Sequence, residues 1–129
     1  INIGSSCVFH GRISNEILRE VLTDCDIAVN PDLPSKLNNI SSMNKIVEYM
    51  ALGLPIIQYN SKEGKNTAGD SIIEISEYSP KSFAEAILKL SESIIKRQAM
   101  REVAVNRFRE LAWETQEGIL VSLYNRIAS

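Results

Sequence analysis

One segment in the first half of the chain brings together residues that could bind an anion. It runs from residue 41 to residue 57, and helical spacing gathers its apolar side chains on one side while Ser41, Lys45 and Glu48 lie on the other. An apolar face of this kind packs against a protein core. The polar face is therefore expected to be free to bind a ligand.

The end of the same segment predicts where that polar face lies in the fold. Gly53 suits the left-handed conformation that ends a helix, Pro55 prevents the helix from continuing, and the apolar Ile56 and Ile57 begin a strand. A helix followed at once by a buried strand is typical of a crossover in a parallel sheet. The N-terminus of this helix is therefore expected at the ligand-binding edge of the sheet.

The ligand that suits this helix N-terminus is a phosphate or a diphosphate. Residues 33–47 contain no Asp or Glu, but they contain two lysines, three serines and three asparagines. No Glu or Gln stands three residues after Ser41 or Ser42, so no capping box occupies the first-turn amides. An ordinary serine cap with a surface pair between Lys45 and Glu48 is commoner in proteins, and the sequence alone leaves that alternative open.

These residues also resemble a known family of enzymes. The donor-site signature of retaining GT-B glycosyltransferases of the family 4 type is similar to K-x-x-E-Y-M-A-x-G-x-P-I-I, residues 45–57. Residues 8–13 resemble the strand-to-loop element of that family, and residues 22–31 resemble the segment that precedes the donor loop. The likeness covers essentially the whole chain, and residues 42–53 are particularly similar to a bacterial polysaccharide-assembly subgroup.

The resemblance implies how the nucleoside and the sugar of the donor would be bound. Glu48 matches the second of two acidic residues of the family and would bind the ribose hydroxyls, since a carboxylate can accept two hydrogen bonds from a vicinal diol. Ile40 stands where the first acidic residue is expected. The sugar contact would then come from the adjacent Asn39 or from backbone amides, or it would be lost.

The resemblance also implies how the rest of the donor would be held. It places the diphosphate at Ser41, Ser42 and Met43. Lys45 would balance the charge of the diphosphate, and no metal ion or other cofactor is implied. Gly11 and Arg12 lie in the donor-side loop, where a glycine lets the backbone approach the nucleotide closely.

The elements that must position these residues alternate between strands and helices, which predicts an α/β fold with a Rossmann-like, doubly wound parallel sheet and a helical C-terminal end. The expected strands are residues 6–10, 26–30, 55–59 and 71–75. The expected helices are a first one capped by Ser14, then residues 42–52, 80–92, 93–110 and 114–128. Residues 31–40 and 60–70 are expected to be loops. The larger aromatic side chains of the helices are expected to pack in the core or to dock on another domain.

Composition agrees with one ordinary domain and excludes several classes of protein. The chain has 129 residues and a net charge of −2, which argues against a general nucleic-acid binder despite basic residues between 96 and 109. Those basic residues suit a solvated helix face, or a contact with an anionic membrane surface. Cys7 and Cys25 are expected to be free buried thiols in a reducing compartment, and a lone histidine, His10, leaves no zinc-binding pattern.

The resemblance implies that residues 1–129 are the C-terminal, donor-binding domain of a larger two-domain enzyme. That enzyme would transfer a hexosyl group from a nucleotide sugar in the synthesis of a bacterial cell-surface polysaccharide, in the cytoplasm or at the inner face of the membrane. The acceptor and the catalytic base would belong to the other domain. The isolated fragment is expected to be inactive, and the apolar C-terminal helix to contact the missing domain or a second copy.

Two other functions stay open on the sequence. A sugar-nucleotide epimerase has the same two-domain architecture, but its signature residues do not occur in this chain. A flavodoxin-like or receiver-type signalling domain has a similar length and alternation of elements. Asp24 and Asp26 do not follow a first strand as a receiver requires, and residues 10–12 do not form a hydroxyl-rich phosphate loop.

Overall fold

Three short parallel strands form the centre of the chain, which a computed structural model describes over residues 4–128. The strands β1 (Ala28–Asn30), β2 (Ile56–Tyr59) and β3 (Ile72–Ile75) lie in the order β1-β2-β3. Their register aligns Ala28 with Ile56 and Ile56 with Ile72. The sheet is therefore the predicted Rossmann-like α/β sheet.

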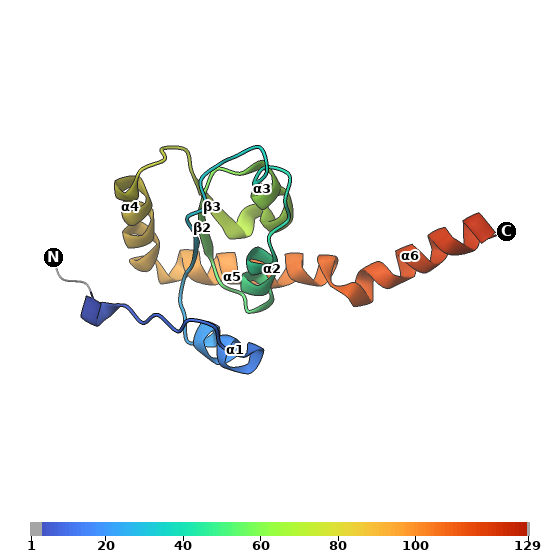
Figure 1. Ribbon diagram of the computed structural model, residues 1–129, viewed down its shortest axis with the longest axis horizontal. Helices are drawn as coiled ribbons and strands as arrows, with labels where there is room; N and C mark the ends of the chain where they lie inside the picture. The colour runs from blue at the N-terminus through green and yellow to red at the C-terminus, as the bar shows by residue number, and fades with distance from the viewer. Residues whose placement is uncertain (1–3, 129) are drawn as a thin grey trace.

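Helices cover both faces of this sheet and continue beyond it (Figure 1). They are α1 (Asn15–Thr23), α2 (Asn44–Ala51), α3 (Lys62–Ala68), α4 (Pro80–Ser91), α5 (Ile94–Leu111) and α6 (Trp113–Ala128), with short 3-10 turns at Gly4–Ser6 and Gly69–Ser71. The helices α2, α3 and α5 pack together, whereas α4 packs on β2 and β3.

The alternation of side chains along the strands divides the core into two clusters. Ala28, Ile56 and Ile72 pack with α2 and with Ala104 of α5 on one face. On the other face, β2 and β3 pack with α4 and with another part of α5. The helix α5 thus contributes to both clusters and fixes the sheet between its two layers.

Local sequence signals explain where most helices begin and end. The hydroxyl of Ser14 accepts a hydrogen bond from the amide of Ile17, and Ser79, followed by Pro80, caps α4 in the same way. Gly53 has a φ of 67°, as the predicted left-handed stop requires. These predicted boundaries are confirmed.

Residues 6–10 do not form the predicted strand. Gly4–Ser6 is a 3-10 turn, and the side chains of Val8 and Phe9 are 78% and 92% exposed. A strand needs a neighbour to satisfy its backbone groups, and no strand of the described residues pairs with this segment. Cys7 is exposed rather than buried for the same reason, and Cys25 is partly buried.

Residues 60–70 are not the predicted loop, because they contain the helix α3. Ser61 caps this helix by accepting a hydrogen bond from the amide of Gly64. Thr67 and Ala68 are buried at its end, so α3 is held by burial that its polar composition does not indicate.

The last helix departs from the body of the molecule. In Figure 1, α6 extends away from the sheet beyond the end of α5. Trp113 and Tyr124 are 59% and 65% exposed, so they do not pack in the core of the described residues, and their docking to another domain stays a prediction. Core packing is confirmed for Phe83, which is buried against Tyr59, and for Phe108, which is partly buried.

Candidate functional site

The helix α2 begins at Asn44, two residues later than predicted, and Met43 occupies its cap position. No side chain accepts a hydrogen bond at this cap. Ser41 and Ser42 therefore precede the helix instead of capping it, and the ordinary serine cap is not formed. The first-turn amides lack a side-chain acceptor, as the phosphate hypothesis requires.

The ammonium group of Lys45 contacts two side chains of another segment and does not pair with Glu48. Its Nζ lies 2.7 Å from Oδ2 of Asp32 and 3.1 Å from Oδ1 of Asn30. Both partners belong to the C-terminal end of β1 and the loop after it. The alternative of a surface pair with Glu48 is not what forms, because the loop after β1 brings Asp32 beside the first turn of α2.

A second acidic side chain approaches from α3. The hydroxyl of Ser42 donates a hydrogen bond to Oε1 of Glu63 at 2.6 Å, and the hydroxyl of Thr67 donates to the same oxygen at 3.3 Å. The bond from Ser42 is the main cause that lowers the pKa of Glu63 below its ordinary value. The residues around the start of α2 thus include no Asp or Glu, but Asp32 and Glu63 lie close to it in the folded chain.

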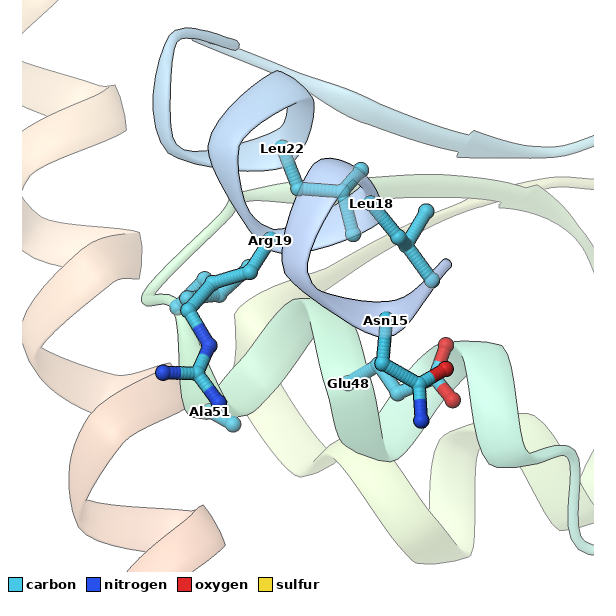
Figure 2. A pocket seen from close by; sticks show the side chains of 7 residues that line it. Asn15, Leu18, Arg19, Leu22, Glu48 and Ala51 are labelled. Atoms are coloured by element: carbon cyan, nitrogen blue, oxygen red, sulfur yellow. The ribbon is translucent and has the colours of Figure 1, made fainter. Parts of the chain in front are cut away.

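Glu48 does not lie at the start of α2 but lines a pocket between α1 and α2 (Figure 2). The pocket has a volume of about 240 Å³. Its lining consists of Asn15, Leu18, Arg19, Leu22, Glu48, Ala51 and Leu52. Glu48 is exposed, and no side chain of the described residues forms a hydrogen bond or ion pair with it.

The chemistry of this pocket combines an apolar wall with a charged rim. Leu18, Leu22 and Leu52 line the pocket and are partly buried, so they offer an apolar surface. Asn15 can donate and accept hydrogen bonds, and the unpaired carboxylate of Glu48 can accept them. An apolar pocket with a few convergent polar groups is typical of a small-molecule site.

The other predicted residues are spread over several places. Gly11 and Arg12 are exposed and precede α1 by a few residues. Asn39 is partly buried, and its Oδ1 accepts a hydrogen bond from the amide of Lys62 at 3.1 Å. Ser41 is partly buried. The structure therefore brings Glu48 into the α1–α2 pocket without Asn39 or Ser42.

Sequence reasoning missed the wall that α1 contributes. The apolar residues of this helix recur at helical spacing, yet none of its residues is fully buried. The available signal was the polar Asn15 and Arg19 on the same side as Leu18 and Leu22. A helix whose stripe mixes apolar and polar side chains can line a pocket rather than a core.

Comparison with protein-family models assigns the chain to a family. Residues 2–93 match the model described as Glycosyl transferases group 1. The chain belongs to this family. The matched residues include α1, α2 and the whole α1–α2 pocket, whereas α5 and α6 follow the match. Comparisons with curated proteins and with solved structures gave no match.

Family membership makes this chain a glycosyltransferase domain, which favours transferase chemistry over a flavodoxin-like or receiver-type function. Within residues 4–128, no group of three or more His, Cys, Asp or Glu side chains could hold a metal ion. In the same described range, no helix is long and apolar enough to cross a bilayer.

Proposed function

We propose that the chain is the C-terminal, nucleotide-sugar-binding domain of a retaining, family 4-like glycosyltransferase with a GT-B fold. Such an enzyme breaks the bond between the anomeric carbon and the diphosphate, and it forms a bond from that carbon to an acceptor hydroxyl. The domain proposed here binds the leaving nucleoside diphosphate. The acceptor and the groups that activate it belong to another domain.

The single observation that carries the proposal is the position of Glu48 beside the α1–α2 pocket. Its carboxylate is exposed and unpaired among the described residues, so it can accept both hydroxyls of a ribose diol without breaking an existing contact. The apolar wall formed by Leu18, Leu22 and Leu52 suits the flat face of a nucleoside base. Asn15 and Arg19 add donors that suit its polar edge.

The diphosphate is proposed to lie at the start of α2. The uncapped first-turn amides and the positive end of the helix dipole favour negative charge there. Lys45 supplies a neutralising ammonium when it turns from Asp32 to the ligand. These groups would stabilise the negative charge that develops on the leaving group, which is the main electrostatic contribution a donor domain makes to glycosyl transfer.

The proposal extends to the cellular role of the whole enzyme. It places the enzyme in the cytoplasm or at the inner face of the membrane, where it would build a bacterial cell-surface polysaccharide from a nucleotide-activated hexose. The acceptor would be a lipid-linked or polysaccharide chain, and donor binding would be independent of a metal ion. Support for this part comes from the sequence resemblance alone.

The test is a titration of the ¹⁵N-labelled chain with UDP, GDP and FMN, followed by NMR chemical-shift mapping. Shifts are expected for UDP or GDP at Asn15, Glu48 and the first turn of α2. The variant Glu48→Gln should weaken binding about tenfold, which corresponds to about 1.4 kcal/mol. The control Glu102→Gln changes an exposed glutamate of α5 and should leave affinity unchanged.

Two results would contradict this assignment. One is a set of shifts confined to α4 and α5, far from the pocket. The other is an equal change in affinity by Glu48→Gln and Glu102→Gln, because the effect would then not be specific to the pocket. Preferential stabilisation by FMN would revive a flavodoxin-like function.

A further inference from the structure

A side chain of α5 binds the end of α3. Arg107 donates a hydrogen bond from Nε to the carbonyl oxygen of Thr67 at 3.1 Å, and another from Nη2 to the carbonyl oxygen of Asn66 at 3.0 Å. The last carbonyl groups of a helix have no partner within the helix, and they carry the negative end of its dipole. A guanidinium group satisfies both needs, so Arg107 closes the C-terminal end of α3.

The remaining nitrogen of this guanidinium group is held within α5. Nη1 of Arg107 donates to Oε2 of Glu110 at 2.6 Å, and the side chain of Arg107 is 33% exposed. The planar fork of an arginine donates in three directions at once, whereas a lysine ammonium offers its donors from a single atom. The contact with two carbonyl groups and a carboxylate is therefore specific to arginine.

The hydrogen bonds continue from α3 to the start of α2. Thr67 accepts from Arg107 with its carbonyl oxygen, and its hydroxyl donates to Oε1 of Glu63 at 3.3 Å. The same carboxylate oxygen accepts a hydrogen bond from the hydroxyl of Ser42 at 2.6 Å. Ser42 directly precedes Met43, the cap position of α2. A chain of hydrogen bonds thus joins α5 to the place where the diphosphate is proposed to lie.

These residues surround a small cavity between α2, α3 and α5, three helices that pack together (Figure 1). The cavity has a volume of about 270 Å³. Its lining includes Ser42, Glu63, Thr67 and Arg107. The α1–α2 pocket shares none of these residues. The cavity leaves room for the carboxylate of Glu63 to turn away from Ser42 once the end of α3 is no longer held.

The helix α3 depends on contacts at its two ends. It has only seven residues and contains Gly64, and isolated helices of this length are not stable in water. At its first turn, the amide of Lys62 donates to Oδ1 of Asn39 in the loop before α2. At its last turn, Arg107 binds the carbonyl groups. The position of α3 relative to α2 is therefore set in part by a residue of α5.

We propose that Arg107 is a positioning residue for the donor site: by holding the last carbonyl groups of α3, it places Glu63 against Ser42 at the start of α2. Arg107 acts through α3 and does not touch the ligand. The importance of this place for a diphosphate rests on the proposed function, whereas the placement of Glu63 does not. Because α5 follows residues 2–93, a segment beyond the family match shapes the site.

This placement limits how tightly a nucleoside diphosphate is held. The carboxylate of Glu63 repels the phosphate groups and occupies the hydroxyl of Ser42. When Arg107 no longer holds α3, Glu63 is no longer fixed at this place and both effects weaken. UDP should then bind about two- to fivefold more tightly, the range expected of one exposed charge. In the native chain the same effect favours release of the nucleoside diphosphate after transfer.

The experiment compares the chain with the variant Arg107→Lys, which keeps the positive charge but loses the forked contact. A carboxyl ¹³C NMR titration follows Glu63, whose pKa is lowered chiefly by the bond from Ser42 and further by the bond from Thr67. This pKa should rise toward the ordinary value of a glutamate in the variant. Amide hydrogen exchange in α3 should become at least about tenfold faster, while exchange in α4 stays unchanged.

A matched control and a double-mutant cycle separate positioning from other effects. Arg109→Lys changes an exposed arginine of the same helix, which binds Asn106 within α5, and it should leave the pKa of Glu63 and the exchange of α3 unchanged. UDP is then titrated into Arg107→Lys, Glu63→Gln and the double variant. Arg107→Lys should tighten UDP binding in the native background and have no effect once Glu63→Gln has removed the carboxylate.

Three outcomes would overturn the proposal. The first is an unchanged pKa of Glu63 in Arg107→Lys. The second is a fall in melting temperature without faster exchange in α3, which would mean that Arg107 serves stability alone. The third is an effect on UDP binding that is absent, or equal with and without the carboxylate of Glu63. If UDP binds to none of these chains, the proposed function fails, while the pKa and the exchange rates still decide whether Arg107 places Glu63.

Discussion

The contact between Gly64 and Gln58 predicts that replacing this helix glycine by alanine destabilises the chain, whereas such a replacement ordinarily stabilises a helix. Gly64 lies inside α3, where replacing glycine by alanine ordinarily stabilises a helix by about 0.5–1 kcal/mol. A Cβ atom at this position would lie 2.2 Å from Nε2 and 2.5 Å from Oε1 of Gln58. Because Gln58 is completely buried, its amide cannot swing out into solvent.

Gly64→Ala is therefore expected to destabilise the chain. Overpacking a buried site costs about 1–3 kcal/mol, and the gain in helix propensity offsets only part of it. The expected net loss is about 1–2 kcal/mol in the free energy of unfolding. For a chain of this size, each kcal/mol corresponds to a fall of about 4 °C in melting temperature.

Urea unfolding followed by far-UV circular dichroism measures this loss, and a double-mutant cycle assigns it. In a Gln58→Ala background the obstacle is gone, so Gly64→Ala should become neutral or stabilising. The control is Gly118→Ala in α6, where a Cβ meets no atom within 4 Å and should stabilise. Equal destabilisation by Gly64→Ala in both backgrounds would refute the role of Gln58, and stabilisation in the native background would refute the clash itself.

Further predictions concern the nucleotide site, the pH response and the fold. In the full-length enzyme, Glu48→Gln should lower kcat/KM at least about tenfold with little change in melting temperature, and unchanged activity would remove its ribose role. The lowered pKa of Glu63 means that the stabilisation from its bond to Ser42 is present above the unfolded pKa and is lost as pH falls through the folded pKa. A carboxyl NMR titration should show a midpoint below the ordinary value of a glutamate, and Ser42→Ala should raise that midpoint. Gly53→Ala should cost about 1–2 kcal/mol in urea unfolding, because φ is 67° there. A labelled-donor assay should detect no glycosyl transfer by the isolated chain.

Local sequence signals predicted the fold where neighbouring residues decide the structure. Ser14, Ser79 and Pro80 begin helices and Gly53 ends one, because caps and stops depend on a few adjacent residues. Residues 6–10 have the composition of a strand but no strand of the described chain beside them. The helix α3 was missed because its own sequence is polar, whereas its packing depends on Gln58 beneath Gly64 and on the burial of Thr67 and Ala68.

The candidate site was predicted in part for a similar reason. Glu48 was found from its place in a motif, and the pocket beside it became visible only when α1 and α2 were placed together. The absence of acids from residues 33–47 is a fact about sequence, whereas electrostatics depends on distance in space. Asp32 directly precedes that range and Glu63 belongs to α3. Both nevertheless form hydrogen bonds with residues within the range.

These two acids bear on how a diphosphate can occupy the start of α2. The pair between Lys45 and Asp32 is about 40% exposed on each side, and exposed ion pairs contribute only about 0–1 kcal/mol. Breaking that pair therefore costs less than the attraction between Lys45 and a multiply charged diphosphate supplies. Glu63 cannot turn away at the same cost, because Ser42 and Thr67 both donate to it.

A diphosphate at the helix start must consequently take the hydroxyl of Ser42 from Glu63 or approach from the side away from it. Glu63→Gln removes the negative charge while keeping an acceptor for both hydroxyls. This variant should tighten UDP binding, and the gain should shrink at high salt because screening weakens the repulsion that was removed. A titration at low and high ionic strength measures both effects. Weaker UDP binding by Glu63→Gln would show that the carboxylate holds Ser42 in the orientation that the ligand needs.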